Sequence, residues 1–223
     1  MTIQAEWNMP PEKLERVWRT WAAADLMLCE EAYLRLYTFD ANWSAGQRMG
    51  KLDNGGGNTV FVLFTPAGTV IKGFDHESEV SRHARDDSEP WPNIYSGMPE
   101  QLFEALNDPA FEPDDVTFCL WRGPSDTHWW RGFKLPVGVD DGSDDLLSFL
   151  FSTPDDYAEW AADNYEQPVN AEVLALMADG APITQELIVQ FNPERDAEAA
   201  ISELLESGLV DPSTGGIHLR GNE

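Results

Sequence analysis

The chain has few cysteines and no long hydrophobic run. Two cysteines among 223 residues, Cys29 and Cys119, cannot form the disulfide framework of a small secreted domain, and each lies in an apolar stretch. No window reaches the roughly 18–20 apolar residues of a membrane span. The first residues lack the basic start and apolar run of a signal peptide. We therefore expect a cytoplasmic protein with two buried, reduced thiols.

Basic residues are also scarce. Fourteen Lys and Arg face forty Asp and Glu, for a net charge of -26. Residues 1–74 have a net charge of -1 and residues 75–223 of -25, and no base lies between Lys134 and Arg195. Such a potential repels nucleic acid and anionic lipid and attracts cations. We expect a basic protein partner, no nucleic acid and no membrane. The alternative is a housekeeping protein whose acidic surface only maintains solubility.

The first two-thirds of the chain predicts one long helix and about four antiparallel strands. Apolar residues recur every three or four positions after Pro10-Pro11, which indicates an amphipathic helix. Two β-branched and aromatic runs separated by Thr65-Pro66-Ala67-Gly68 indicate a hairpin. The predicted segments, in chain order, are a helix at 11–37, a loop at 46–57, strands at 59–64 and 69–74, a short helix at 99–106, and strands at 116–121 and 128–135.

The last third has helical periodicity. Thr153-Pro154-Asp155-Asp156 is a helix start, with a hydroxyl N-cap, proline at the first position and two acids. Gly208 is expected to end the last helix, and the tail after Val210 is expected to be frayed. Because strands and helices are segregated, the sequence predicts a single α+β domain. Its parts are an N-terminal helix (1–45), a sheet region (58–136) and a helical region (143–208).

One cluster could bind a metal ion. His76, Glu77, Glu79 and His83 follow a predicted strand, and imidazole with carboxylate suits zinc or manganese. The two histidines are seven positions apart, however, whereas the helical zinc signature needs four. The alternative is a set of solvated side chains. Gly55-Gly56-Gly57 precedes a strand rather than a helix, so no nucleotide or other cofactor is indicated.

An aromatic group and an acidic group are the candidates for partner binding. Trp129 and Trp130 must face opposite sides of a strand, so one is exposed unless a helix covers it. An exposed tryptophan beside carboxylates has the composition of an interface hot spot. The aromatic group comprises Trp91, Tyr95, Trp121, Trp129 and Trp130. The acidic group comprises Asp140, Asp141, Asp144, Asp145, Asp155, Asp156 and Glu159, although acids in loops and at helix starts are also ordinarily solvated.

Several segments resemble a family of uncharacterised bacterial proteins. They are Phe74-Asp75-His76-Glu77-Ser78, Trp91-Pro92 with Tyr95-Ser96-Gly97-Met98-Pro99, residues 115–122, and the stretch from Tyr157-Ala158-Glu159-Trp160-Ala161 to Asn192-Pro193. The resemblance spans most of residues 60–205. Proteins of this sort resemble the acidic immunity proteins of bacterial polymorphic toxin systems. The resemblance implies binding of a cognate toxin, often a basic nuclease, and carries over no catalytic residue.

No motif specifies a reaction. The chain has no Gly-x-Ser-x-Gly elbow, and Cys119 lies among apolar residues that disfavour a thiolate. The sequence therefore predicts a non-enzymatic acidic protein that sequesters or inhibits a basic partner, such as a toxin. The alternatives are a metal-dependent hydrolase that uses the histidine cluster and the housekeeping protein. The oligomeric state stays open.

Overall fold

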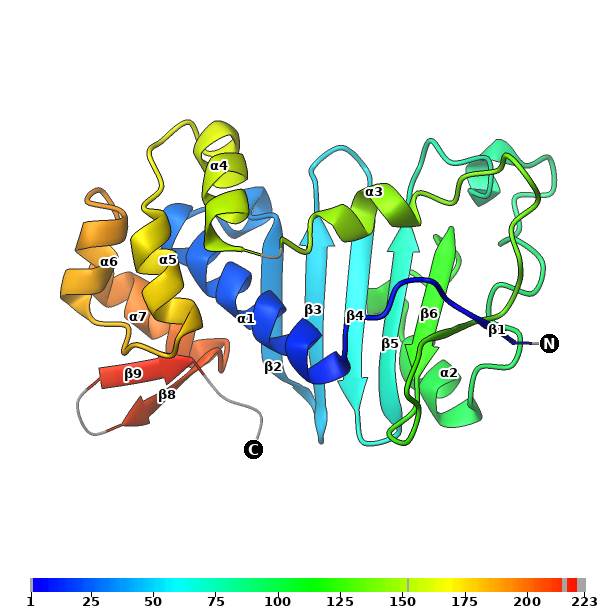
Figure 1. The fold of residues 1–223 in the computed structure, drawn as a ribbon, viewed down its shortest axis with the longest axis horizontal. Helices are drawn as coiled ribbons and strands as arrows, with labels where there is room; N and C mark the ends of the chain where they lie inside the picture. Colours follow the sequence, from blue (N-terminus) through cyan, green and yellow to red (C-terminus); the bar gives the residue numbers. More distant parts are fainter. Residues whose placement is uncertain (1, 152, 214–215, 220–223) are drawn as a thin grey trace. The chain divides into compact units, whose positions relative to one another are not determined.

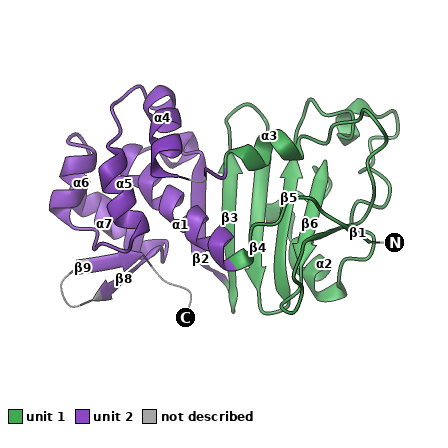
Figure 2. Ribbon diagram, viewed as in Figure 1, with its two compact units in different colours: residues 1–11, 44–149 green, residues 12–43, 150–223 purple. Residues whose placement is uncertain are grey.

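The computed structural model describes residues 2–151, 153–213 and 216–219. The chain divides into two compact units: residues 1–11 with 44–149, and residues 12–43 with 150–223 (Figure 2). Together their elements give the predicted α+β class. Within those described ranges, no helix combines the length and apolar character needed to cross a membrane. The single domain expected from the sequence stays a prediction.

The first unit is built on an antiparallel sheet (Figure 1). Its six strands lie in the order β1-β7-β6-β5-β4-β3, and every neighbouring pair is antiparallel. They are β1 (Ile3–Gln4), β3 (Gln47–Asp53), β4 (Thr59–Thr65), β5 (Gly68–Phe74), β6 (Phe118–Arg122) and β7 (Trp130–Arg131). The unit's helices are α2 (Glu100–Leu106), α3 (Ser143–Ser148) and the 3₁₀ turns η2 (Arg82–Ala84) and η3 (Pro109–Phe111).

The predicted hairpin forms the centre of this sheet. β4 and β5 are buried along almost their whole length, because apolar side chains occupy both faces of each strand. Lys72 on β5 is also buried, although it is charged. Its Nζ donates to the carbonyls of Phe111 (2.6 Å) and Glu112 (2.9 Å). Burial lowers the pKa of this amine to about 8. These bonds tie η3 to the sheet.

Two expectations for the sheet region are wrong. The first unit alone has six strands rather than four, since β3 occupies most of the predicted loop at 46–57 and β1 was not expected. Pairing with β4 stabilises β3, in which Gly50 and Leu52 are buried opposite Val62 and Val60. The strand predicted at 128–135 is limited to Trp130–Arg131.

The second unit contains helices, one long strand and a small hairpin. The elements are α1 (Pro11–Leu28), η1 (Ala32–Leu34), β2 (Tyr37–Ser44), α4 (Pro154–Asn164), α5 (Ala171–Ala178), α6 (Gln185–Phe191), α7 (Ala197–Glu206), β8 (Val210–Ser213) and β9 (Gly216–Leu219). Thr153 caps α4 as predicted, accepting from the Asp156 N–H. The tail expected to be frayed forms the β8–β9 hairpin in residues 210–213 and 216–219.

The long helix expected over 11–37 is shorter. It ends at Leu28, and the chain enters strand β2 at Tyr37. Side chains from distant segments donate to the buried carbonyls of its last turn. Asn192 Nδ2 donates to Leu28 (3.1 Å) and Met27 (3.0 Å), and Arg195 Nε donates to Leu26 (3.2 Å). Cationic groups at a helix C-terminus are favourable because they complement its dipole. The end of α1 is therefore set by tertiary contacts.

A buried carboxyl group lies at the centre of the second unit. Asp25 on α1 is fully buried; its Oδ2 accepts from the Tyr37 N–H (2.6 Å) and its Oδ1 from the Tyr157 hydroxyl. The Tyr157 ring stacks on Trp21 with centroids 4.5 Å apart. Desolvation raises the pKa of Asp25 to about 7, although these hydrogen bonds and Arg35 act in the opposite direction. Asp25 thus joins α1, β2 and α4.

Candidate functional site

Both units are acidic. The first contains nineteen acidic and eight basic residues, a net charge of -11, and the second has a net charge of -15. The difference in net charge between residues 1–74 and residues 75–223 therefore does not correspond to one neutral unit and one acidic unit. Arg19, Arg35, Lys72 and Arg195 are buried, so a substantial share of the few bases lies inside. Among described residues, the buried acids are Glu15, Asp25 and Asp141.

The predicted acidic group is divided between the units. Asp140, Asp141, Asp144 and Asp145 belong to the first unit, whereas Asp155, Asp156 and Glu159 lie on α4 in the second. Six of the seven are exposed. Asp141 is the exception at 1% exposure, and its Oδ2 accepts from Arg131 Nη2 at 2.6 Å. Its carboxylate is therefore engaged within the fold, and its assignment to partner binding stays a prediction.

The tryptophans predicted as an anchor are less exposed than expected. Trp129 is completely buried; its indole N–H donates to the Met9 carbonyl (2.7 Å), and its ring lies 5.3 Å from that of Trp7. Trp130 is half-buried, pairs across the sheet with Trp121, and has the His128 ring 4.2 Å away. All nine tryptophans lie in the described ranges, and each is buried or half-buried. None of them offers the exposed anchor expected from the sequence.

The structure does not assemble the predicted metal cluster. His76 Nδ1 lies 2.7 Å from Asn58 Oδ1, and His83 Nε2 lies 3.1 Å from Asp115 Oδ1. Glu77 and Glu79 are exposed. Within residues 2–151, 153–213 and 216–219, no three His, Cys, Asp or Glu side chains are grouped so that they could hold a metal ion. The two histidines thus have separate local partners, Asn58 and Asp115.

A groove of about 830 Å³ lies beside residues 140–145, the acidic segment of the first unit. Asp140 and Asp144 line it together with Glu6. Its apolar lining comes from β1 and the residues after it, β6, the segment after β7, and α3: Ile3, Ala5, Trp7, Leu120, Phe133, Leu135, Val139 and Leu147. The groove, called here the acidic groove, combines exposed carboxylates with apolar walls.

Hydrogen bonds hold the acidic segment in place. The Asp140 carbonyl accepts from the Ser78 hydroxyl (2.7 Å) and the Asp141 carbonyl from the Thr117 hydroxyl (2.7 Å). Gly142 has a φ of +75° and packs so closely on Asp75 that a Cβ would lie 2.5 Å from its side chain. A glycine is required here by both conformation and space. The carboxylates of the acidic groove are therefore presented by a fixed backbone.

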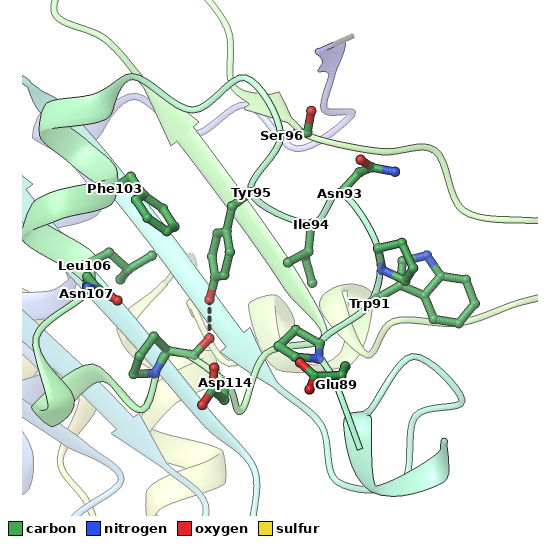
Figure 3. Close-up of a pocket in the computed structure, with 13 residues that line it drawn as sticks. Glu89, Trp91, Asn93, Ile94, Tyr95, Ser96, Phe103, Leu106, Asn107 and Asp114 are labelled. Carbon is green, nitrogen blue, oxygen red and sulfur yellow. Dashed lines mark hydrogen bonds between the residues drawn. The ribbon is translucent and has the colours of Figure 1, made fainter. Parts of the chain in front are cut away.

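A second hollow, of about 480 Å³, lies between the segment 89–96, the end of α2 and residues 113–114 (Figure 3). The Tyr95 ring stands at its centre; the hydroxyl donates to the Pro113 carbonyl at 2.6 Å, and the ring contacts Phe103 edge to face at 5.6 Å. Glu89 and Asp114 lie toward the end of the pocket where the Tyr95 hydroxyl points. We call this hollow the aromatic pocket.

The position of the aromatic pocket was predicted only in part. Trp91 and Tyr95 of the aromatic group line it, whereas Phe103, Glu89 and Asp114 were not singled out as a site. These five residues come from three separate segments of the chain, 89–96, α2 and 113–114. Nothing in their spacing along the sequence indicates that they meet. A weak signal was available in the prolines at 90, 92 and 99, which favour a fixed, extended backbone around the aromatic residues.

Comparison with known proteins identifies no relative: no protein-family model, no curated protein sequence and no solved structure matches the chain.

Proposed function

We propose that this chain is a non-enzymatic acidic binding protein that sequesters or inhibits a basic protein partner, in the manner of the immunity proteins that neutralise bacterial toxins. The observation that carries the proposal is the acidic groove. It places Asp140, Asp144 and Glu6 around apolar walls. Carboxylates at a rim attract a cationic protein and orient it, and apolar surface inside the rim supplies affinity once water is excluded.

The charge distribution supports the same proposal. Each unit is strongly acidic, and Arg131, which borders the groove, is engaged with Asp141. Lys134 is the other base in the lining. A basic surface approaching the groove therefore meets the carboxylates of Asp140, Asp144 and Glu6, which outnumber the exposed ammonium of Lys134. Oriented charge of this kind mainly accelerates association and has less effect on dissociation.

Co-expression provides the first test. Basic secreted toxins encoded in the same genome are produced with and without this chain, and bacterial growth is measured. Rescue by the intact chain, together with a complex that survives purification at low salt, is the expected result. For the purified pair, affinity should fall at least about tenfold between 50 and 300 mM NaCl, mainly through slower association. An affinity indifferent to salt would refute the electrostatic argument.

Matched variants then locate the surface. Asp140→Asn with Asp144→Asn removes two charges at the acidic groove, and we expect the affinity to fall roughly threefold to tenfold. Asp163→Asn with Asp179→Asn removes two exposed carboxylates from the second unit. This control has the same net charge as the groove variant. Equal losses in both variants would show that net charge, and not the groove, determines binding.

A further inference from the structure

The aromatic pocket has the chemistry of a cation site. Among the thirteen described residues that line it, two are acidic, Glu89 and Asp114, and none is basic. Its remaining surface is largely apolar and aromatic, and Phe103 is 42% exposed. Acidic groups near aromatic rings favour a cation with an apolar stem, because the stem packs on the rings while the charge reaches the carboxylates.

The pocket wall is fixed without any ligand. The Tyr95 hydroxyl is held by the Pro113 carbonyl, and burial raises the pKa of this phenol well above its usual value. Gly132 lies directly against the segment, since a Cβ there would be 2.3 Å from the Asn93 carbonyl oxygen. Asn93, in the same segment, adopts a left-handed φ of +66°. A ligand therefore meets a preformed surface and little ordering entropy is lost.

The charges inside the pocket are only partly neutralised by the protein. Arg82 Nη1 lies 3.6 Å from Asp114 Oδ2, but the closer contact of this guanidinium is with Asp115, at 2.8 Å from Nε. The Asp114 side chain is 71% exposed. Arg85, the other nearby base, is paired with Asp87 at 2.6 Å and lies over the Trp91 ring. Glu89 and Asp114 are thus accessible to an incoming cation.

We propose that the aromatic pocket receives an arginine side chain of the basic partner. The methylene stem packs on Tyr95 and the exposed ring of Phe103, and the guanidinium meets Glu89 and Asp114. Arginine fits better than lysine because its planar fork contacts two carboxylate oxygens at once and is weakly hydrated, whereas an ammonium keeps its water more strongly. The volume of about 480 Å³ holds such a side chain with part of its backbone. The inference rests on the proposed function, because it names the group that the partner inserts.

Small probes test the pocket independently of any partner. Acetyl-arginine amide, acetyl-lysine amide and acetyl-citrulline amide are titrated into the ¹⁵N-labelled full chain. We expect the arginine probe to bind most tightly and to shift the amide signals of residues 89–96 and 113–114. Citrulline has nearly the same shape without the charge. Arginine binding no tighter than citrulline binding would overturn the inference.

Matched variants assign the binding to the carboxylates. Glu89→Gln with Asp114→Asn should weaken the arginine probe at least fivefold, whereas Asp140→Asn with Asp144→Asn, at the acidic groove, should leave it unchanged. An unchanged affinity in the Glu89 and Asp114 variant would overturn the inference, and dispersed amide signals confirm that each variant is folded. Phe103→Ala provides a second pocket variant, with weaker binding expected from the lost apolar wall.

The same variants separate the two proposals. If the pocket variant binds arginine normally while the groove variant loses the basic partner, the arginine site is wrong and the proposed function stands. If the arginine probe binds in the pocket but no basic protein binds the intact chain, the proposed function is wrong.

Discussion

Asp25→Asn should remove a defined part of the pH dependence of stability. In the folded protein, burial keeps the Asp25 carboxyl protonated up to a pKa of about 7, whereas in the unfolded chain it loses its proton near 3.8. Between these values the folded state binds more protons than the unfolded state, so stability falls as pH rises. The contribution is fully present below the unfolded pKa and is lost as pH passes through 7.

The size of this loss of stability follows from the difference between the folded and unfolded pKa values of Asp25. One pH unit within the window corresponds to about 1.4 kcal/mol. From pH 5.5 to pH 8.0 the folded protein should therefore lose about 2 kcal/mol of unfolding free energy through Asp25 alone. Asparagine has the same shape and does not titrate, and its side-chain oxygen can still accept from the Tyr37 N–H. The variant should lack this loss.

Urea unfolding followed by tryptophan fluorescence at pH 5.5 and 8.0 measures the effect. The difference between the two pH values is compared in the intact protein, in Asp25→Asn and in Asp155→Asn, an exposed control on α4. The three proteins share their other ionisable groups, so the contributions of those groups cancel in the comparison. A pH difference in Asp25→Asn within about 0.5 kcal/mol of that in the intact protein would show that Asp25 is ionised in the fold.

Three further substitutions test individual hydrogen bonds and one close packing contact. Lys72→Met leaves the carbonyls of Phe111 and Glu112 without their donor, so unfolding free energy should fall by about 1–3 kcal/mol in urea titrations. Gly73→Ala would place a Cβ 2.1 Å from the ring of buried Phe118; we expect a loss of roughly 1–3 kcal/mol, and an unchanged melting temperature would contradict this packing. Thr153→Ala removes the N-cap of α4 and should lower stability by about 1 kcal/mol, whereas Thr153→Ser should retain it, as thermal unfolding can show.

Elements with strong local signals were predictable. β4 and β5 are continuous β-branched and aromatic runs around a four-residue turn, so both composition and turn chemistry favour the hairpin. The start of α4 carries its own cap at Thr153. In both cases the residues that determine the structure lie within the element itself, and a single sequence contains the information.

Elements set by distant partners were not predictable. β3 has the sequence Gln-Arg-Met-Gly-Lys-Leu-Asp, which has little β propensity, and it becomes a strand because β4 offers a complete edge. The periodicity of α1 continues past Leu28, but Asn192 and Arg195, more than 160 residues away in the chain, bind its last carbonyls. The number of strands and the end of the helix depend on contacts that periodicity does not contain.

The candidate site was predicted in chemistry more than in position. Exposed carboxylates at Asp140 and Asp144 were expected and do line a groove. Trp129 was a poor choice of anchor because alternation along a strand indicates which of two neighbours faces the core only when the register is known. The aromatic pocket needed three segments to be placed together, and Glu89 and Asp114 look like ordinary loop acids in the sequence.

The position of these carboxylates bears on whether the acidity serves binding or only solubility. Solubility depends on net charge and is indifferent to which exposed carboxylates supply it. It gives no reason for Asp140 and Asp144 to line a groove with apolar walls, or for Glu89 and Asp114 to line an aromatic pocket whose lining includes no base. Neutralising either pair should therefore affect solubility as much as neutralising any other exposed pair does. Only at the acidic groove and the aromatic pocket should the same loss of charge also weaken the binding of a cation.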